Sequence, residues 1–356
     1  MNILLLSRYS RVGASSRLRS YQYLSCLKEH GIDVTVSPLL GDDYLARLYS
    51  NNRKDLRSVG FSYLRRCCSL LKSRSFDLLW VEYELFPWLP AWAEIALSHF
   101  GIPYIVDYDD AIFHRYDQNP RKVVQTFLGN KIAMIMRHAD AVVVGNNYLA
   151  EYAVCAGAQR VKFIPTVIDL NRYSIKERTK AAELRVGWIG SPQTAKYLNL
   201  VKPAIRRLYN EGNVSFSVVG SGQIDLDGVP MSIIPWSEET EVDHIQDFDI
   251  GIMPLPDSQW EQGKCGYKLI QYMACGKPVV ASPVGANRKI VEHGVNGFLA
   301  GSTEEWLEAL TVLRDNSDLR KKMGTAGRKK VEKRYCIQVT ARRLLSILQS
   351  VEKNYS

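Results

Sequence analysis

Several features that define protein classes are missing from this sequence of 356 residues. Its longest apolar runs, such as residues 3–6 and 141–144, are far shorter than the about 20 residues that a membrane-spanning helix needs. The seven cysteines are odd in number and form no Cys-x-x-Cys pair, so nothing supports a disulfide framework or a zinc ribbon. No basic stretch precedes the short apolar run at the N-terminus, as it would in a signal peptide. We therefore expect a cytoplasmic protein with reduced thiols.

Acidic residues are outnumbered by basic ones, with 37 Asp and Glu against 46 Lys and Arg, which gives a net charge of +9. A basic surface suits nucleic acid, anionic lipid or phosphorylated small molecules, and charge alone does not choose among them. Nucleic acid is not expected as a partner, because no predicted strand interleaves base-stacking aromatic residues with lysines.

The shortage of acids is most marked between Tyr44 and Arg74, where Asp55 is the only acidic residue. Apolar side chains are interleaved with the basic ones, and Gly60 is expected to interrupt the helix. A basic amphipathic helix can lie on an anionic membrane surface, which would place the protein at the inner face of the plasma membrane. The alternative is an ordinary amphipathic helix that packs on a sheet and leaves its arginines in solvent.

Short apolar runs alternate with longer segments of helical period along the chain. Near-continuous apolar strands between helices indicate parallel sheets that are covered on both faces. The sequence therefore predicts an α/β fold of two doubly wound, Rossmann-like domains. The expected strands are residues 2–6, 33–37, 78–82, 103–107, 141–145, 161–165, 185–190, 214–220, 231–234, 249–253, 278–281 and 297–300.

A polar segment at residues 169–184 is the expected linker between an N-terminal domain, residues 1–168, and a C-terminal domain, residues 185–335. The last segment, residues 336–356, is expected to form a helix that packs on its own domain or crosses back to the first. Within the first domain, residues 17–30 are expected to form one continuous helix.

A loop of small residues follows the first expected strand, at residues 7–17, and opens a helix. Backbone N–H groups at the positive end of a helix dipole suit a phosphate group, which makes Gly13, Ser16 and Arg17 candidate ligands for an anion. The loop lacks the Gly-x-Gly-x-x-Gly fingerprint of dinucleotide binding. The alternative is a plain helix start with Ser15 or Ser16 as the capping residue.

Three carboxylates, those of Asp107, Asp109 and Asp110, lie at the C-terminal end of an expected strand, where ligands bind in open α/β sheets. They repel one another unless a cation or a network of sugar hydroxyls balances them. A divalent metal and contact with hydroxyls or a leaving group both fit this pattern, and the alternative is a helix start that favours acids. His114, nearby, is a lone histidine that we expect to be structural.

Two further loops open helices in the second half of the chain. At residues 187–196 a strand leads into Gly190 and Ser191, and Lys196 could then meet a phosphate. A plain turn with a surface lysine is the alternative. At residues 261–278, two glycines and two lysines open a helix that is expected to end at Gly276, which predicts a site for a diphosphate.

This second segment supplies Lys264, Gly266, Tyr267 and Lys268 to the predicted diphosphate site. Gln271 lies on the same side of the helix by the spacing of three and four residues, and it could reach a ribose.

At this segment the sequence resembles family 4 of the retaining glycosyltransferases, which have the two-domain GT-B fold. Residues 164–169 (Ile-Pro-Thr-Val-Ile-Asp) look like the family's motif at the domain junction, and residues 218–222 (Val-Val-Gly-Ser-Gly) look like its strand end. Residues 273–282 nearly repeat the family consensus, and residues 284–299 match its glycine-rich closing stretch. The motifs occur in the family's order over most of the chain.

The resemblance implies that a nucleotide sugar, with UDP as the default nucleotide, binds mainly to the C-terminal domain. The acceptor, a polysaccharide or a lipid-linked glycan, would bind mainly to the N-terminal domain. Transfer would retain the anomeric configuration, because the departing phosphate takes the proton of the acceptor. Catalysis would rest on stabilising the leaving group, and neither a metal nor another cofactor is expected.

The sequence departs from the family at several positions of the site. The two glutamates that the family often carries are replaced by Gly263 and Gln271, although an amide at Gln271 can keep a hydrogen bond to ribose. The family's Gly-Arg pair appears here as Gly190 and Ser191, Lys196 aligns with its phosphate lysine, and Asp109 stands where many members have a histidine. The sequence thus looks like a divergent subgroup. The catalytic candidates are Asp109, Asp110, Lys196 and Lys268, and the donor-binding candidates are Gly13, Ser16, Arg17, Gly190, Ser191, Lys196, Trp236, Lys264, Gly266, Tyr267, Lys268 and Gln271.

Two other functions remain open at this point. A non-catalytic partner protein could have kept the fold and lost the chemistry, which the missing glutamates would explain. A nucleotide-sugar epimerase on the same fold would need an acid and a base in its site, whereas the segment at 273–278 favours transfer.

Overall fold

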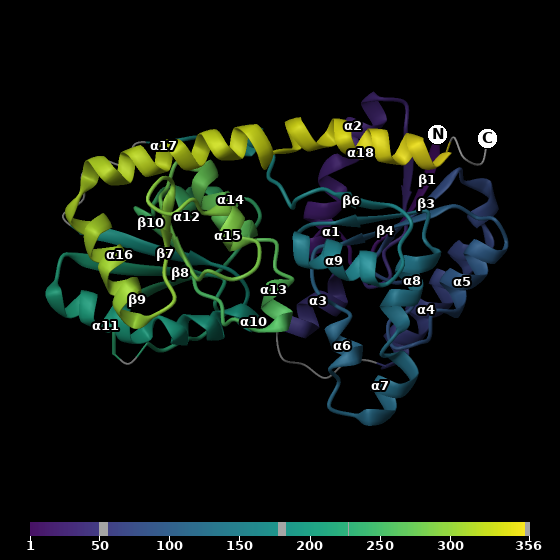
Figure 1. Cartoon of the computed structure of the whole chain (residues 1–356), viewed down its shortest axis with the longest axis horizontal. Coiled ribbons are helices and arrows are strands. Elements are labelled where there is room, and N and C mark those ends of the chain that lie inside the picture. The colour runs from purple at the N-terminus through teal and green to yellow at the C-terminus, as the bar shows by residue number, and fades with distance from the viewer. Residues whose placement is uncertain (50–55, 177–182, 227, 353–356) are drawn as a thin grey trace. The chain divides into compact units, whose positions relative to one another are not determined.

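The computed structural model describes residues 1–49, 56–176, 183–226 and 228–352 (Figure 1). The chain divides into two compact units. The first unit consists of Met1–Thr166, Gly263–Cys265 and Thr340–Ser356, and the second consists of Val167–Gln262 and Gly266–Val339. Each unit contains one six-stranded sheet in which every pair of neighbouring strands is parallel. The prediction of a doubly wound α/β fold in two parts is confirmed.

The sheet of the first unit has the strand order β2-β1-β3-β4-β5-β6. Its central strands are buried on both faces, which is why they are near-continuous apolar runs in the sequence. β1 lies between β2 and β3, with Ile3 opposite Val34 on one side and Leu78 on the other. The strands are β1 (Asn2–Leu6), β2 (Asp33–Val36), β3 (Leu78–Glu82), β4 (Tyr104–Tyr108), β5 (Ala141–Val144) and β6 (Val161–Phe163).

Helices cover both faces of this sheet. Tyr63, Leu97, Ile132 and Leu149, each from a different helix, pack against one face in a single apolar cluster. On the opposite side, the Tyr23 hydroxyl lies 2.8 Å from Oγ1 of Thr340, so α18 lies beside the first helical turns of the chain (Figure 1). The helices are α1 (Ala14–Arg19), η1 (Tyr21–Tyr23), α2 (Leu24–Glu29), α3 (Asp42–Tyr49), α4 (Leu56–Leu71), η2 (Ser73–Ser75), α5 (Trp92–His99), α6 (His114–Asp117), α7 (Lys122–Leu128), α8 (Lys131–His138), α9 (Asn147–Cys155) and, from Thr340 onward, α18 (Ile337–Glu352).

The prediction of one helix over residues 17–30 is wrong. The segment is broken into α1, the 3₁₀ turn η1 and α2. The break begins at Ser20, whose backbone leaves the helical region at φ −132° and whose hydroxyl donates 2.8 Å to the carbonyl of Ser16. Serine side chains that bond back to a preceding carbonyl compete with the regular helix ladder in this way.

The basic segment between Tyr44 and Arg74 also differs from expectation. Gly60 does not interrupt a helix, because α4 runs through it from Leu56 to Leu71. Arg66 is buried rather than solvated, and its Nη2 donates 2.6 Å to the carbonyl of Ser7. Arg53, Lys54 and Asp55 lie outside the described residues.

The sheet of the second unit has the strand order β12-β11-β10-β7-β8-β9. Two apolar clusters surround it, one built around Trp188 and Leu310 and the other around Ile189 and Tyr272. The strands are β7 (Leu184–Ile189), β8 (Val214–Val219), β9 (Met231–Ile234), β10 (Ile250–Met253), β11 (Val279–Ala281) and β12 (Gly297–Leu299). The helices are η3 (Leu170–Arg172), α10 (Pro192–Ala195), η4 (Lys196–Leu200), α11 (Lys202–Glu211), α12 (Glu241–Gln246), α13 (Gln259–Gln262), α14 (Tyr267–Ala274), α15 (Asn287–Ile290), α16 (Thr303–Asp315) and α17 (Ser317–Arg334).

Among the residues that the structure describes, no helix combines the length and the apolar composition needed to cross a bilayer.

Candidate functional site

The strand order of the second sheet indicates where a ligand would bind. The chain runs from β7 to β8 on one side and later returns to β10 on the other side of β7, so the order reverses there. Ligands of open α/β sheets bind beyond the C-terminal ends of the strands at such a switch point. The loop that follows β7 carries Gly190 and Ser191, two of the predicted donor-binding residues.

Lys268 lies against this loop. A Cβ atom at Gly190 would lie only 2.5 Å from the ring of Trp188 and 2.8 Å from Cε of Lys268, so the Trp188 ring leaves room only for glycine at this position. The Lys268 ammonium lies 3.5 Å from Oγ1 of Thr194 and 5.1 Å from the centre of the Trp188 ring. The structure therefore brings Lys268 and Gly190 together, at the end of β7.

The two remaining residues of this loop have different surroundings. Ser191 begins α10 and forms a reciprocal capping box with Thr194. Lys196 is exposed, and its ammonium lies 5.4 Å from the centre of the Tyr197 ring. These surroundings fit the alternative, in which Lys196 is a surface lysine.

The helix that was expected to open after Lys264 is α14, from Tyr267 to Ala274. Gly266 precedes it in the left-handed conformation with φ +68°, which favours glycine. Lys268 lies in the first turn of α14, so its charge adds to the positive end of the helix dipole.

Gln271 is buried, with 3% of its surface exposed, and its Nε2 donates 2.9 Å to the Tyr173 hydroxyl. The Tyr173 hydroxyl also lies 3.4 Å from the hydroxyl of Tyr267 and donates a hydrogen bond of 3.3 Å to the carboxylate of Glu241. Burial, together with the nearby Tyr267 and Glu241, raises the pKa of Tyr173 well above its ordinary value. Tyr173 therefore stays a neutral hydrogen-bonding centre that holds Gln271 in place.

Trp236 joins the same network, because its Nε1 donates 3.0 Å to the carboxylate of Glu241. The structure thus links three predicted residues, Trp236, Tyr267 and Gln271, through Tyr173 and Glu241. Sequence reasoning missed Tyr173 and Glu241. The only signal for Glu241 was its place in an acidic run after Trp236, and Tyr173 fell in the expected linker.

In the first unit the order of strands reverses at β1, between β2 and β3. For the loop after β1, a helix start capped by Ser15 or Ser16 was the alternative to an anion site, and this alternative is wrong because Gly13 precedes α1 and no side chain caps it. The Ser16 hydroxyl instead donates a hydrogen bond of 2.6 Å to Glu82 and accepts one of 3.1 Å from the backbone N–H of Tyr9. Arg17 is buried, with Nη1 3.4 Å from the carbonyl of Val12.

Glu82, at the end of β3, holds this loop through two hydrogen bonds. Besides the one from Ser16, its carboxylate accepts a hydrogen bond of 2.8 Å from the backbone N–H of Arg8. Burial raises the pKa of Glu82 to about 7, although the hydrogen bonds from Ser16 and Arg8 lower it. Glu82 was not among the predicted site residues, because its position became informative only when β3 was placed beside β1.

The three carboxylates at the end of β4 and just after it have three different partners. Asp107 accepts two hydrogen bonds from the Arg19 guanidinium, at 2.7 and 3.1 Å. Asp109 accepts from the Tyr83 hydroxyl, and burial and the neighbouring Asp110 raise its pKa to about 6. Asp110 forms an ion pair of 2.9 Å with Lys264. Cationic partners thus balance Asp107 and Asp110, whereas the repulsion from Asp110 still raises the pKa of Asp109.

Lys264 lies in Gly263–Cys265, the short segment that packs with the first unit. Asn146 donates 2.7 Å to the carbonyl of Gly263, and the Cys265 thiol donates 3.1 Å to the carbonyl of Asp109. The lysine that was predicted beside a diphosphate is therefore held against Asp110. Within the described ranges, no group of three or more His, Cys, Asp or Glu side chains is placed to hold a metal ion.

Two doubly wound α/β units, each with one reversal of strand order, are the architecture of the GT-B fold. Two family models match the chain in succession. The model described as "Glycosyl transferase 4-like domain" matches residues 18–166, and the model described as "Glycosyl transferases group 1" matches residues 183–316.

Solved structures share this fold over nearly the whole chain. The sucrose-phosphate synthase of Thermosynechococcus elongatus has a TM-score of 0.74 and 14% sequence identity, over 98% of each chain. HepE of Anabaena, in complex with UDP and glucose, has a TM-score of 0.65 and 16% identity, over 98% of this chain and all (100%) of that chain.

Curated relatives match over shorter stretches. Spore coat protein SA of Bacillus subtilis (strain 168) is 29% identical over 97 residues, or 26% of this chain and 25% of that protein. Phosphatidyl-myo-inositol mannosyltransferase of Mycobacterium leprae (strain TN) is 35% identical over 88 residues, or 24% of this chain and 23% of that protein. Each match spans about a quarter of the relative's length. The family models thus match two successive parts of the chain to glycosyl transferase domains, and the solved structures show that the fold is GT-B.

Proposed function

We propose that this chain is a cytoplasmic enzyme that transfers a sugar from a UDP-sugar to a polysaccharide or lipid-linked glycan, with retention of the anomeric configuration. The observation that carries the donor half of the proposal is the position of Lys268 against Gly190, at the switch point of the second sheet. HepE of Anabaena, which shares the fold, has been crystallised with UDP and with UDP-glucose, and this supports UDP as the nucleotide.

In this mechanism the bond between the anomeric carbon and the β-phosphate oxygen breaks. The acceptor oxygen forms the new bond on the same face of the sugar, and the acceptor proton passes to the departing diphosphate. Lys268 and the positive end of the α14 dipole stabilise the negative charge that develops on the leaving group. Gly190, Ser191 and Gly266 allow the phosphates to approach the backbone, and Lys196 supplies a second cation from the same loop.

The network around Tyr173 is assigned to the nucleoside. Gln271 is held by Tyr173, and Trp236 is held by Glu241, so both side chains have a fixed orientation. A preorganised amide and an aromatic ring bind a ribose and a base with little loss of side-chain entropy.

The residues of the first unit are assigned to the sugar and the acceptor. Asp109 and Asp110 are proposed to accept hydrogen bonds from hydroxyl groups. Gly13, Ser16, Arg17 and Lys264 are proposed to contact anionic parts of the substrates. No metal or other cofactor is included in the mechanism.

The experiment is calorimetric titration of the full chain with UDP, GDP and ADP. We expect UDP to bind saturably and Lys268→Ala to weaken it by about tenfold to a hundredfold, the usual loss when a hydrogen bond to a charged group is removed. Lys321→Ala is the matched control, because Lys321 is an exposed lysine of α17 in the same unit. Equal affinity in wild type and Lys268→Ala would refute the assigned donor site.

A second candidate, a nucleotide-binding partner without transfer activity, is favoured by one observation. Gln271 stands where the family often has a glutamate, and it is bonded to Tyr173 inside the protein. The candidates separate on turnover. If UDP binds but no UDP-sugar is consumed in the presence of glycan acceptors, the partner protein is the correct assignment.

A further inference from the structure

Helix α4 has an apolar ridge on the side that faces away from the core. Phe61, Leu64 and Leu71 have 70, 66 and 86% of their surfaces exposed. Their spacing of three and seven residues places them along one side of the helix. The core-facing side of the same helix carries Tyr63 and Leu70, which pack on the sheet. An amphipathic helix normally keeps its opposite face polar, so this second apolar face needs an explanation of its own.

The surroundings of the ridge are basic. No acidic residue occurs between Leu56 and Phe76, whereas Arg65, Lys72 and Arg74 are exposed there. Arg65 also donates 2.8 Å to the carbonyl of Pro38, which fixes the position of its charge. Apolar side chains flanked by cations complement a surface that is apolar beneath a layer of negative charge.

A second exposed segment lies against the same helix. The Tyr63 hydroxyl of α4 donates to the carbonyl of Pro87, and the Tyr63 ring lies 5.5 Å from that of Phe86. The chain then continues into three exposed apolar residues. These are Trp88, Leu89 and Trp92, with exposed fractions of 47, 43 and 72%, and we call them the tryptophan segment.

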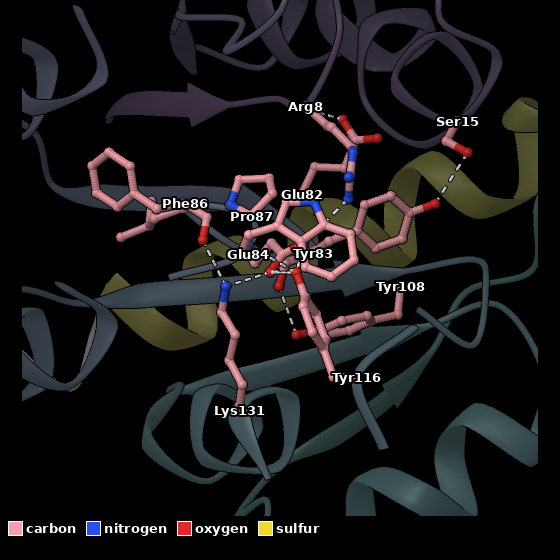
Figure 2. A network of polar contacts seen from close by, with 12 residues as sticks. Arg8, Ser15, Glu82, Tyr83, Glu84, Phe86, Pro87, Tyr108, Tyr116 and Lys131 are labelled. Carbon is pink, nitrogen blue, oxygen red and sulfur yellow. Dashed lines mark hydrogen bonds and ion pairs between the residues drawn. The ribbon is translucent and has the colours of Figure 1, made fainter. Parts of the chain in front are cut away.

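The tryptophan segment is held rigidly by a buried polar network (Figure 2). The Lys131 ammonium donates 2.6 Å to the carbonyl of Phe86 and also bonds to Glu84, and Arg8 forms an ion pair of 3.3 Å with Glu84. The Tyr116 hydroxyl donates a hydrogen bond of 2.7 Å to Glu84 and accepts one of 3.1 Å from the backbone N–H of Trp88. The network thus fixes the backbone from which the exposed side chains project.

Trp88 itself has a left-handed backbone with φ +66°, a conformation that bulky residues rarely adopt. Its ring packs edge-on against Tyr116, with 5.3 Å between the ring centres. Such strain persists only where the surrounding structure enforces it, and it concentrates at functional positions. Here it holds a large apolar side chain half exposed.

We propose that the α4 ridge and the tryptophan segment form one surface that docks on an anionic lipid bilayer. Tryptophan is enriched where a protein meets the headgroup layer, and exposed arginine and lysine side chains attract acidic lipids. The inference adds a membrane to the proposed function and does not depend on which nucleotide binds.

A second copy of the chain is a poorer occupant of this surface. A symmetric dimer would place the same patch of both copies together, with Arg65 and Lys72 of one copy near those of the other. Like charges brought together at an interface oppose association. A bilayer with acidic headgroups meets the same cations with opposite charge.

The test is co-sedimentation of the full chain with vesicles of phosphatidylcholine and phosphatidylglycerol, and with vesicles of phosphatidylcholine alone. We expect binding to the anionic vesicles that weakens as salt is added. Arg65→Gln/Lys72→Gln should weaken it by about fivefold for each lost cation, and Phe61→Ser/Leu64→Ser by at least about tenfold. Trp92→Ser should also weaken vesicle binding, because Trp92 belongs to the tryptophan segment.

The matched control is Val154→Ser/Phe163→Ser, which removes two exposed apolar residues of the same unit on α9 and β6. Strand β6 is the edge strand at the opposite end of the sheet from β2. Vesicle binding should be unchanged in this control, and circular dichroism should show that every variant is folded.

The inference fails if the wild type does not sediment with anionic vesicles, or if the ridge variants bind as well as the control. It also fails if light scattering shows a dimer that Phe61→Ser/Leu64→Ser dissociates, since the ridge would then be a subunit interface. UDP calorimetry on the same samples keeps the two proposals apart, because the donor site should bind UDP equally in all these variants.

Discussion

Two carboxylates of the first unit, the buried Glu82 and the partly exposed Asp109, have pKa values raised to about 7 and about 6. Burial is the largest cause for both, because it disfavours the charged form. Both lie at the C-terminal edge of the sheet, Glu82 as the last residue of β3 and Asp109 directly after the neighbouring strand β4. Groups that titrate near neutral pH at such an edge are suited to exchanging hydrogen bonds with a substrate.

These raised pKa values predict how stability depends on pH. A carboxyl whose pKa is higher in the folded protein stabilises the fold while it is protonated, so this contribution is complete below about 4.5 for Glu82 and is lost as pH rises through about 7. The free energy of unfolding should therefore fall between pH 5 and pH 8 by an amount on the order of a few kcal/mol, because each tenfold change in proton affinity corresponds to about 1.4 kcal/mol. Urea unfolding at several pH values measures it.

In Glu82→Gln the same titration should be flatter, because the amide does not ionise. Glu211→Gln, which alters an exposed glutamate of the second unit, is the control and should keep the slope of the wild type. A slope that is identical in Glu82→Gln and wild type would show that Glu82 does not titrate in this range.

At the scale of the element, Lys131 is the cation on which the tryptophan segment depends. It is buried, and it bonds to both Glu84 and the carbonyl of Phe86. Lys131→Met removes it and leaves the buried Glu84 carboxylate with less compensation, which should cost about 3–5 kcal/mol of stability. Denaturant unfolding tests this, with Lys122→Met on α7 as an exposed control that should change stability by no more than about 0.5 kcal/mol. A loss no larger than the control's would show that the network contributes little.

Most strands could be predicted from the sequence because buried parallel strands are almost wholly apolar. Residues 2–6, 78–82 and 231–234 match β1, β3 and β9, and the other strands lie within two residues of the expected bounds. The helix at 17–30 could not be predicted, because its interruption depends on one serine hydroxyl that bonds to Ser16. Local chemistry of this kind leaves the apolar pattern unchanged.

The candidate site was predictable in part for a related reason. Glycines and lysines that open a helix are neighbours in the sequence, so Gly190 and Lys268 could be named as parts of phosphate loops. Their contact could not, because it joins β7 to α14. Tyr173 and Glu82 were missed because their roles arise from partners that are 98 and 66 residues away in the chain.

At the scale of the whole molecule, the division into units makes α18 important for the stability of the first unit. From Thr340 onward this helix belongs to the first unit, and its Leu344, Leu348 and Val351 are buried. Deleting residues 340–356 should destabilise the first unit by several kcal/mol, since burying one leucine contributes about 1.5–3 kcal/mol. Limited proteolysis with mass spectrometry should then show faster cleavage in residues 1–166 than in wild type.

The same truncated chain should still bind UDP if the donor site lies in the second unit, whose residues the deletion leaves in place. Cleavage at wild-type rates throughout residues 1–166 would refute the structural role of α18.

A protein is made from its N-terminus, and here that order conflicts with the order of assembly. Residues 1–166 are synthesised well before Thr340, the residue of α18 whose hydroxyl bonds to that of Tyr23. At about 5–20 residues per second, the residues from 167 to 352 take on the order of 10–40 s to synthesise. During that time one face of the first sheet has no helix from the C-terminus to cover it. The first unit is therefore completed only after residues 340–352 have been made.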